Sequence, residues 1–146
     1  MSRPILAALF AGALGLGPAV ASLSEDDAQS AARGFGQALR NADASLLKPI
    51  LPSRGKVQLR LVHLGPEQGY FSSSQVEALL RDFFQHGSTQ SFDIIRLECE
   101  PSRLALARGR AAVTDREGRS VEVEIHLAFQ PEGDRWVLRE IRETPP

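Results

Sequence analysis

Cysteine is nearly absent from this sequence: Cys99 is the only one among 146 residues. A single cysteine cannot close a disulfide within the chain, so packing must stabilise the fold. Free cysteines are commonly buried, and we expect Cys99 to act as a small hydrophobic side chain within a strand rather than as a reactive thiol. The three histidines, at positions 63, 86 and 126, have no metal-ligand spacing among themselves or with Cys99. We therefore expect neither a metal nor another cofactor.

An excess of charge of one sign is also lacking. The chain has 17 basic and 18 acidic residues, which gives a formal net charge of −1. Phosphate binding usually needs a clearly basic face, so this balance argues against nucleic acid as the main partner. The sequence has no G-x-S-x-G elbow, no phosphate-binding loop and no dinucleotide fingerprint. These absences exclude the common hydrolase and nucleotide-binding patterns.

Long hydrophobic runs are missing except at the N-terminus, where residues 5–16 are uncharged. This run is too short to span a bilayer comfortably. An arginine precedes it and a proline follows, ahead of the small residues Ala19 and Ala21 at the two positions that a signal peptidase recognises. We therefore predict a signal peptide over residues 1–21, cleaved after Ala21, and a soluble protein of residues 22–146 that is periplasmic or secreted. No cysteine follows the small residues, which argues against a lipid anchor.

Two segments have the spacing of amphipathic helices. In the first, Ser24 is a cap, three acidic residues follow it, and an apolar stripe recurs to Leu39. The second is "SSSQVEALLRDFFQHG", residues 72–87, in which Ser74 and Glu77 form an S-x-x-E capping box. Its apolar face consists of Val76, Leu79, Leu80, Phe83 and Phe84. Between them, "RNADASLLKPILPS" indicates a turn, a short helical step and a loop.

Five segments alternate apolar and polar residues as half-buried strands do. They are "GKVQLRLVHL" (55–64), "SFDIIRLECE" (91–100), "RLALARGRAAVT" (103–114), "SVEVEIHLAF" (120–129) and "RWVLREIRE" (135–143), with "GPEQGYF" (65–71) expected to be a loop. In the last strand, Trp136 and Leu138 are expected on one face, and Val137 and Ile141 on the other. Helices first and a run of antiparallel strands afterwards indicate a single α+β domain.

Three stretches in this pattern resemble the nuclear transport factor 2-like superfamily, and within it the bacterial domain-of-unknown-function 4783 family. They are "FSSSQVEALLRDFFQHGSTQSFDI", "ARGRAAVTDREGRSVEVEIHLAF" and "GDRWVLREIR", with "FGQALRNADASLLKPIL" matching more loosely. The resemblance implies a cone-shaped, strongly bent antiparallel sheet wrapped around the helices. It also implies an apolar pocket in the cone, and frequently a homodimer joined through the outer sheet face. It brings no catalytic residues with it.

His63 is the one candidate catalytic residue, because it continues the inward parity of Val57, Leu59 and Leu61. An inward histidine in a cone could act as a general base near neutral pH. The other interpretation is a histidine at the strand end, either hydrogen-bonded or in contact with water, since the neighbouring apolar residues allow the strand to flip or bulge there.

The remaining polar candidates are expected on the surface. His86 stands at a helix end, and Asp82, like its neighbour Arg81, lies off the apolar stripe. The acidic face of residues 120–129, which carries Glu122, Glu124 and His126, is expected to lie beside the Arg-rich "ARGRAA", with Arg108 and Arg110. That face is either solvated or a polar dimer interface.

Three hypotheses follow for function. The first is a non-catalytic exported module that binds a small apolar ligand in its cone or a protein partner, including a second copy, on its sheet. The second is an isomerase or cyclase that uses His63 as base. The third is a structural envelope protein whose pocket is filled by its own side chains.

Overall fold

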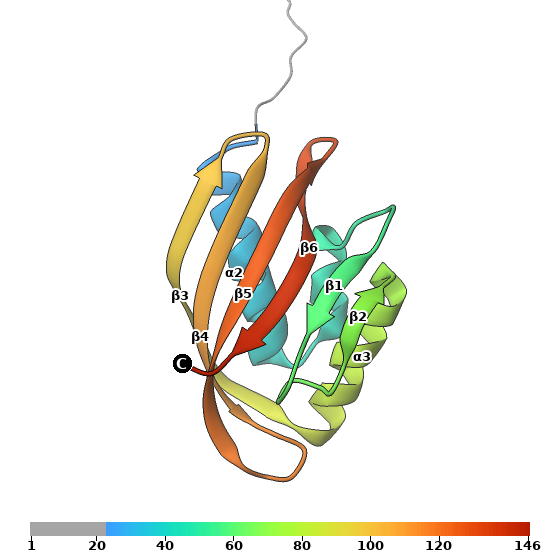
Figure 1. Ribbon diagram of the computed structural model, residues 1–146, viewed down its shortest axis with the longest axis vertical. Coiled ribbons are helices and arrows are strands. Elements are labelled where there is room, and N and C mark those ends of the chain that lie inside the picture. Colours follow the sequence, from blue (N-terminus) through green and yellow to red (C-terminus); the bar gives the residue numbers. More distant parts are fainter. Residues whose placement is uncertain (1–22) are drawn as a thin grey trace, which may run out of the picture.

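Six strands form one curved, mixed sheet in the order β2-β1-β6-β5-β4-β3, and the helices cover one side of it (Figure 1). The computed structural model describes residues 23–146, so the predicted signal peptide lies outside the described residues. The elements are α2 (Glu25–Asn41), the 3-10 helix η2 (Ala44–Ile50), β1 (Val57–Arg60), β2 (Gln68–Phe71), α3 (Ser73–His86), β3 (Ser88–Glu100), β4 (Leu104–Thr114), β5 (Ser120–Glu132) and β6 (Arg135–Thr144). The predicted α+β class is confirmed. In this part of the chain no helix is both long enough and apolar enough to cross a bilayer.

The first helix begins and packs as its sequence predicts. The Ser24 hydroxyl accepts a hydrogen bond from the backbone N–H of Asp27, and the Asp27 carboxylate accepts one from the backbone N–H of Ser24. This reciprocal capping box satisfies two amide donors that a helix start otherwise leaves unpaired. The stripe that includes Phe35 and Leu39 is buried against the sheet.

The second helix begins two residues earlier than predicted. Its capping box joins Ser72 and Gln75, not Ser74 and Glu77, because Ser72 is the residue with extended backbone before the first helical turn. Ser74 already lies inside the helix, and the Glu77 carboxylate instead accepts a hydrogen bond from the Arg81 guanidinium at 2.6 Å. The predicted apolar face is confirmed, with Val76, Leu80 and Phe83 buried and Leu79 and Phe84 packed against the core.

The region between the helices differs from the prediction in two ways. The strand predicted over residues 55–64 has ladder pairing only in β1, and part of the predicted loop 65–71 is the short strand β2. β2 pairs antiparallel with β1, whereas β1 pairs parallel with β6. The sheet is therefore mixed and not wholly antiparallel.

A bulge in β6 changes which side chains point inward. The register passes from Phe129↔Leu138 to Ala128↔Glu140, so Arg139 is the extra residue. Ile141 consequently joins Trp136 and Leu138 in the core cluster, and the prediction that it lies on the opposite face is wrong. By the same change of parity, Glu143 points to the buried side, with only 6% of its surface exposed.

Aromatic side chains fill the space between sheet and helices. Phe35, Phe83 and Phe129 are fully buried, and Phe35 meets Phe92 edge to face with ring centroids 5.8 Å apart. The Phe92 ring fits because glycines stand beside it in α2 and in β4. A Cβ at Gly36 would lie 2.6 Å from the ring, and a Cβ at Gly109 would lie 2.5 Å from it. Cys99 in β3 is half-buried and packs against this core, as predicted.

Candidate functional site

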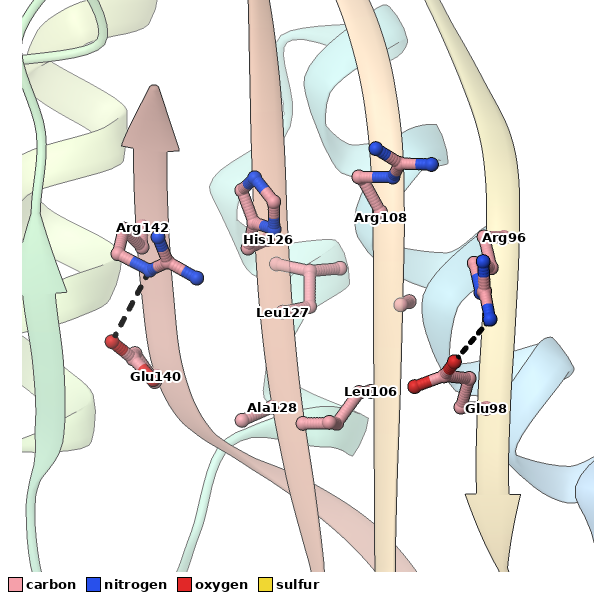
Figure 2. A pocket seen from close by; sticks show the side chains of 10 residues that line it. Arg96, Glu98, Leu106, Arg108, His126, Leu127, Ala128, Glu140 and Arg142 are labelled. Atoms are coloured by element: carbon pink, nitrogen blue, oxygen red, sulfur yellow. Dashed lines mark ion pairs between the residues drawn. The ribbon is translucent and has the colours of Figure 1, made fainter.

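The outer face of the sheet, which no helix covers, carries the first candidate site (Figures 1 and 2). Alternation along each strand sends one set of side chains to the core and the other set to this face. The pairings Arg96↔Arg108, Arg108↔His126 and His126↔Arg142 then align four basic side chains across β3, β4, β5 and β6. We call these four residues the basic row. Arg60 of β1, which pairs with Arg142, continues it.

The adjacent row of the same face is acidic at its ends and apolar at its centre. Glu98, Leu106, Ala128 and Glu140 pair with one another from β3 to β6. Figure 2 shows the two rows side by side. Together they line a hollow of about 190 Å³, in which the small side chain of Ala128 leaves room and Leu106 is 42% exposed. We call this hollow the sheet hollow.

Ion pairs connect the basic row to its acidic neighbours. Arg96 lies 2.6 Å from Glu98, and Arg142 lies 3.7 Å from Glu140. On the other side of the row, Glu124 is 3.7 Å from Arg108 and 3.4 Å from Arg110, which confirms the predicted contact of Glu124 with the Arg-rich strand. Glu122 lies opposite Ala112 and takes no part in this contact.

His126 lies at the centre of the basic row. Its Nε2 lies 3.2 Å from the Thr144 hydroxyl, and its side chain is 28% exposed. Burial and the neighbouring Arg142 guanidinium hold the pKa of His126 below the usual value for histidine, although Glu124 acts in the opposite direction. The His126 imidazole is therefore neutral at pH 7 and lies between the charged guanidiniums of Arg108 and Arg142.

His63 lies beyond the end of β1, at the rim of the sheet and not in the filled interior. Its Nδ1 is 2.8 Å from Oε2 of Glu143, and its side chain is 31% exposed. The Glu143 side chain itself is only 2% exposed. The backbone N–H groups of Val62, His63 and Leu64 all donate to this carboxylate at 2.9–3.0 Å. Glu143 thus holds the whole turn after β1.

Two hollows meet at His63. One, of about 220 Å³, lies at the end of the sheet and is called the end groove here; its lining consists of Val62, His63, Val121, Glu122, Val123, Glu143, Thr144, Pro145 and Pro146. The other, of about 210 Å³, lies between the same turn and the β4–β5 hairpin, with Asp115, Arg116, Glu117 and Arg119 on its wall. Both the turn and the hairpin are in the lower half of Figure 1.

Glu143 is the site residue that sequence reasoning missed. Its partner His63 was singled out from strand parity, but the parity of Glu143 becomes visible only once the bulge at Arg139 is known. The available signal was an acidic residue two positions beyond the buried Ile141.

The other predicted surface residues lie where they were expected. Nδ1 of His86 is 3.0 Å from the carbonyl of Asp82 at the exposed end of α3. The Asp82 carboxylate accepts a hydrogen bond from Arg116, which lowers its pKa. Within residues 23–146, no group of three or more His, Cys, Asp or Glu side chains is arranged to hold a metal ion.

Comparison with known proteins identifies the family and the fold. Residues 33–143 match the model of a domain of unknown function, DUF4783. No curated protein matches the chain. Among solved structures, the chain is similar to DUF4783 family proteins from Bacteroides uniformis (12% identity, TM-score 0.62, covering 78% of this chain and 95% of that one) and Bacteroides fragilis (17%, 0.61, 77% and 96%).

A candidate dehydratase of the NTF2-like family from Streptomyces avermitilis is also similar, with 14% identity, a TM-score of 0.59 and coverage of 83% of this chain and 95% of that one. At such identities the likeness concerns the fold alone. The predicted nuclear transport factor 2-like fold and the resemblance to the DUF4783 family are confirmed.

Proposed function

Because the chain belongs to the DUF4783 family of domains of unknown function, we propose a function from its geometry: a non-catalytic module that binds a protein partner through the outer face of its sheet. The observation that carries this proposal is the basic row beside the half-exposed Leu106 in the sheet hollow. The interior between sheet and helices is packed with the protein's own aromatic side chains, so we propose the outer surface as the place where a partner binds.

The basic row is an unfavourable arrangement for an isolated sheet. Like charges directly opposite each other on neighbouring strands destabilise a sheet, and Arg96 and Arg108 form such a pair in the row, whereas His126 is neutral. Glu124, which pairs with Arg108, is only 12% exposed, but the ion pair Arg96–Glu98 at the end of the row is solvent-exposed, with side chains 64% and 55% exposed. Exposed pairs of this kind contribute roughly 0–1 kcal/mol and exchange partners readily. Carboxylates from a partner would therefore relieve repulsion that the chain relieves only in part by itself.

A second copy of the same chain has the chemistry to be that partner. Neighbouring rows on one face of a strand are about 7 Å apart, since each residue advances the strand by 3.2–3.4 Å. A two-fold axis between the basic row and the row of Glu98, Leu106, Ala128 and Glu140 would place each basic row over the acidic ends of the other copy. The two exposed Leu106 side chains would be buried at the centre of such an isologous interface.

We further propose that this module works outside the cytoplasm. The signal-type N-terminus supports this, as does the anchoring of the chain directly after the expected cleavage site. Leu23 is buried, and its backbone N–H donates to the Ser102 hydroxyl at 2.9 Å. A chain that begins at Ser22 would keep this anchor.

The experiment that tests the binding proposal is sedimentation equilibrium of residues 22–146, alone and as Arg108→Glu. Wild type is expected to form a dimer that the substitution weakens by at least tenfold. The matched control is Arg33→Glu. It makes the same charge change at an exposed position of α2, on the other side of the sheet. A monomeric wild type at millimolar concentration, or equal weakening by both substitutions, would refute the self-association.

A further inference from the structure

We propose that the end groove binds a small, largely apolar molecule that donates a hydroxyl hydrogen bond to Nε2 of His63. This site is separate from the sheet face that the proposed function uses, and neither proposal depends on the other.

Glu143 fixes which nitrogen of His63 is free to accept. The ionised carboxylate can only accept hydrogen bonds, so the Nδ1 that lies 2.8 Å from its Oε2 must carry the hydrogen. In the neutral imidazole of that tautomer, Nε2 has no hydrogen and is an acceptor. The three backbone N–H donors from residues 62–64 hold the carboxylate in place, and the ring orientation is therefore fixed before any ligand arrives.

The wall of the end groove is mainly apolar. Val62 is 61% exposed, and Val121, Val123 and the two prolines 145 and 146 continue the apolar surface. An apolar cavity of 150 Å³ holds benzene. A groove of about 220 Å³ therefore suits a ring with a short alkyl chain, or about ten non-hydrogen atoms.

Charge around His63 favours a neutral ligand over a carboxylate. Glu143 and Glu122 belong to the groove itself. The guanidiniums on the other side of His63 are already engaged: Arg119 pairs with Asp115 at 3.2 Å and with Glu117 at 3.3 Å. Arg116 is likewise paired, with Asp82. An anionic ligand would meet two carboxylates and would have to draw a guanidinium away from its present partner, whereas a hydroxyl needs only the acceptor on Nε2.

The same contact would be the first step of general-base chemistry at His63, in which Nε2 receives a hydroxyl proton. Binding of such a ligand can be measured without a known substrate.

The test uses three probes of nearly equal size: 4-propylphenol, 4-propyltoluene and 4-propylbenzoic acid. Each is titrated into ¹³C-methyl-labelled protein, residues 22–146, and the methyl resonances of Val62, Val121 and Val123 are followed by NMR. The phenol is expected to shift these methyls and to bind about tenfold more tightly than the hydrocarbon, which lacks the donor, and than the acid. In His63→Phe the phenol should bind no better than the hydrocarbon, while the control His86→Phe, at the exposed end of α3, should keep the difference.

Three results would overturn the proposal: no shift of the groove methyls at millimolar phenol, equal affinity for phenol and hydrocarbon, or tightest binding of the acid. If His63→Phe fails to fold, the comparison of the three probes on the wild-type protein decides the matter without it.

Discussion

Replacing Glu143 tests whether one buried carboxylate holds the turn after β1. The carboxylate accepts from three consecutive backbone N–H groups and from the His63 ring, and its side chain is 2% exposed. Three substitutions separate these roles: Glu143→Ala removes every acceptor, Glu143→Gln keeps one oxygen for the backbone donors, and His63→Ala removes only the ring.

The magnitudes follow from which donors water can reach. The N–H of Leu64 is buried, and leaving it unpaired costs about 1–3 kcal/mol; those of Val62 and His63 are part-buried and cost less. Glu143→Ala should therefore lower the free energy of unfolding by about 2–4 kcal/mol. Glu143→Gln turns one acceptor into a donor facing His63 and should cost about 1–2 kcal/mol. His63→Ala removes a partner whose side chain is 31% exposed and should cost about 1 kcal/mol or less.

The assay is urea unfolding at pH 7, followed by tryptophan fluorescence, since Trp136 in β6 is the only tryptophan and is buried. The expected order of destabilisation is Glu143→Ala, then Glu143→Gln, then His63→Ala. If His63→Ala proved as damaging as Glu143→Ala, the ring and not the backbone would be the main partner, and the reasoning would be wrong.

Four further outcomes are expected. Gly36→Ala should lower the melting temperature, because its Cβ would lie 2.6 Å from the Phe92 ring. Gly34→Ala in the same helix should raise the melting temperature, because its Cβ would meet nothing within 4 Å. If calorimetry gave both shifts the same sign, the result would contradict this packing. The backbone N–H of Arg119 holds the pKa of Asp115 below its usual value. The ionised Asp115 carboxylate therefore stabilises the folded protein above about pH 4, and this stabilisation is lost as the pH falls through the folded-state pKa. Asp115→Asn should therefore lose less stability between pH 7 and pH 3 than wild type does, and an unchanged loss in urea titrations would count against this. Burial raises the pKa of the Cys99 thiol, with Glu25 adding to the effect, so iodoacetamide should alkylate it more slowly than free cysteine at pH 8. Edman sequencing of the protein from its host should begin at Ser22, and an intact Met1 would exclude the proposed cleavage.

The local rules of helix and strand formation predicted much of the fold. The cap at Ser24, the stripe of α3 and the long strands β3 to β6 follow from capping chemistry and periodicity, which neighbouring residues determine. The cap of α3 could not be placed, because "SSSQVE" contains both a Ser72–Gln75 and a Ser74–Glu77 signature. Only the backbone conformation of Ser72 distinguishes them. β2 was missed because Gly69 interrupts a very short segment that becomes a strand by pairing with β1.

The candidate sites depend on pairings between distant segments, and these were predicted less completely. The contact of Glu124 with Arg108 and Arg110 was expected, since it needs only two strands joined by one hairpin. The basic row needs the register of four strands, including the irregularities near Ile95 and Arg139, which alternation alone does not encode. His63 was identified by parity, but its contact with Glu143 arises from the bulge and from the parallel pairing of β1 with β6.

Native mass spectrometry of the protein purified from its own host would show whether the outer sheet face binds a polypeptide. Wild type, Arg108→Glu and Arg33→Glu would be compared under identical conditions. We expect a complex, with a second copy or with another protein, that is present in wild type and in Arg33→Glu and is lost in Arg108→Glu. A bare monomer in all three samples, or a complex that Arg108→Glu leaves intact, would contradict it.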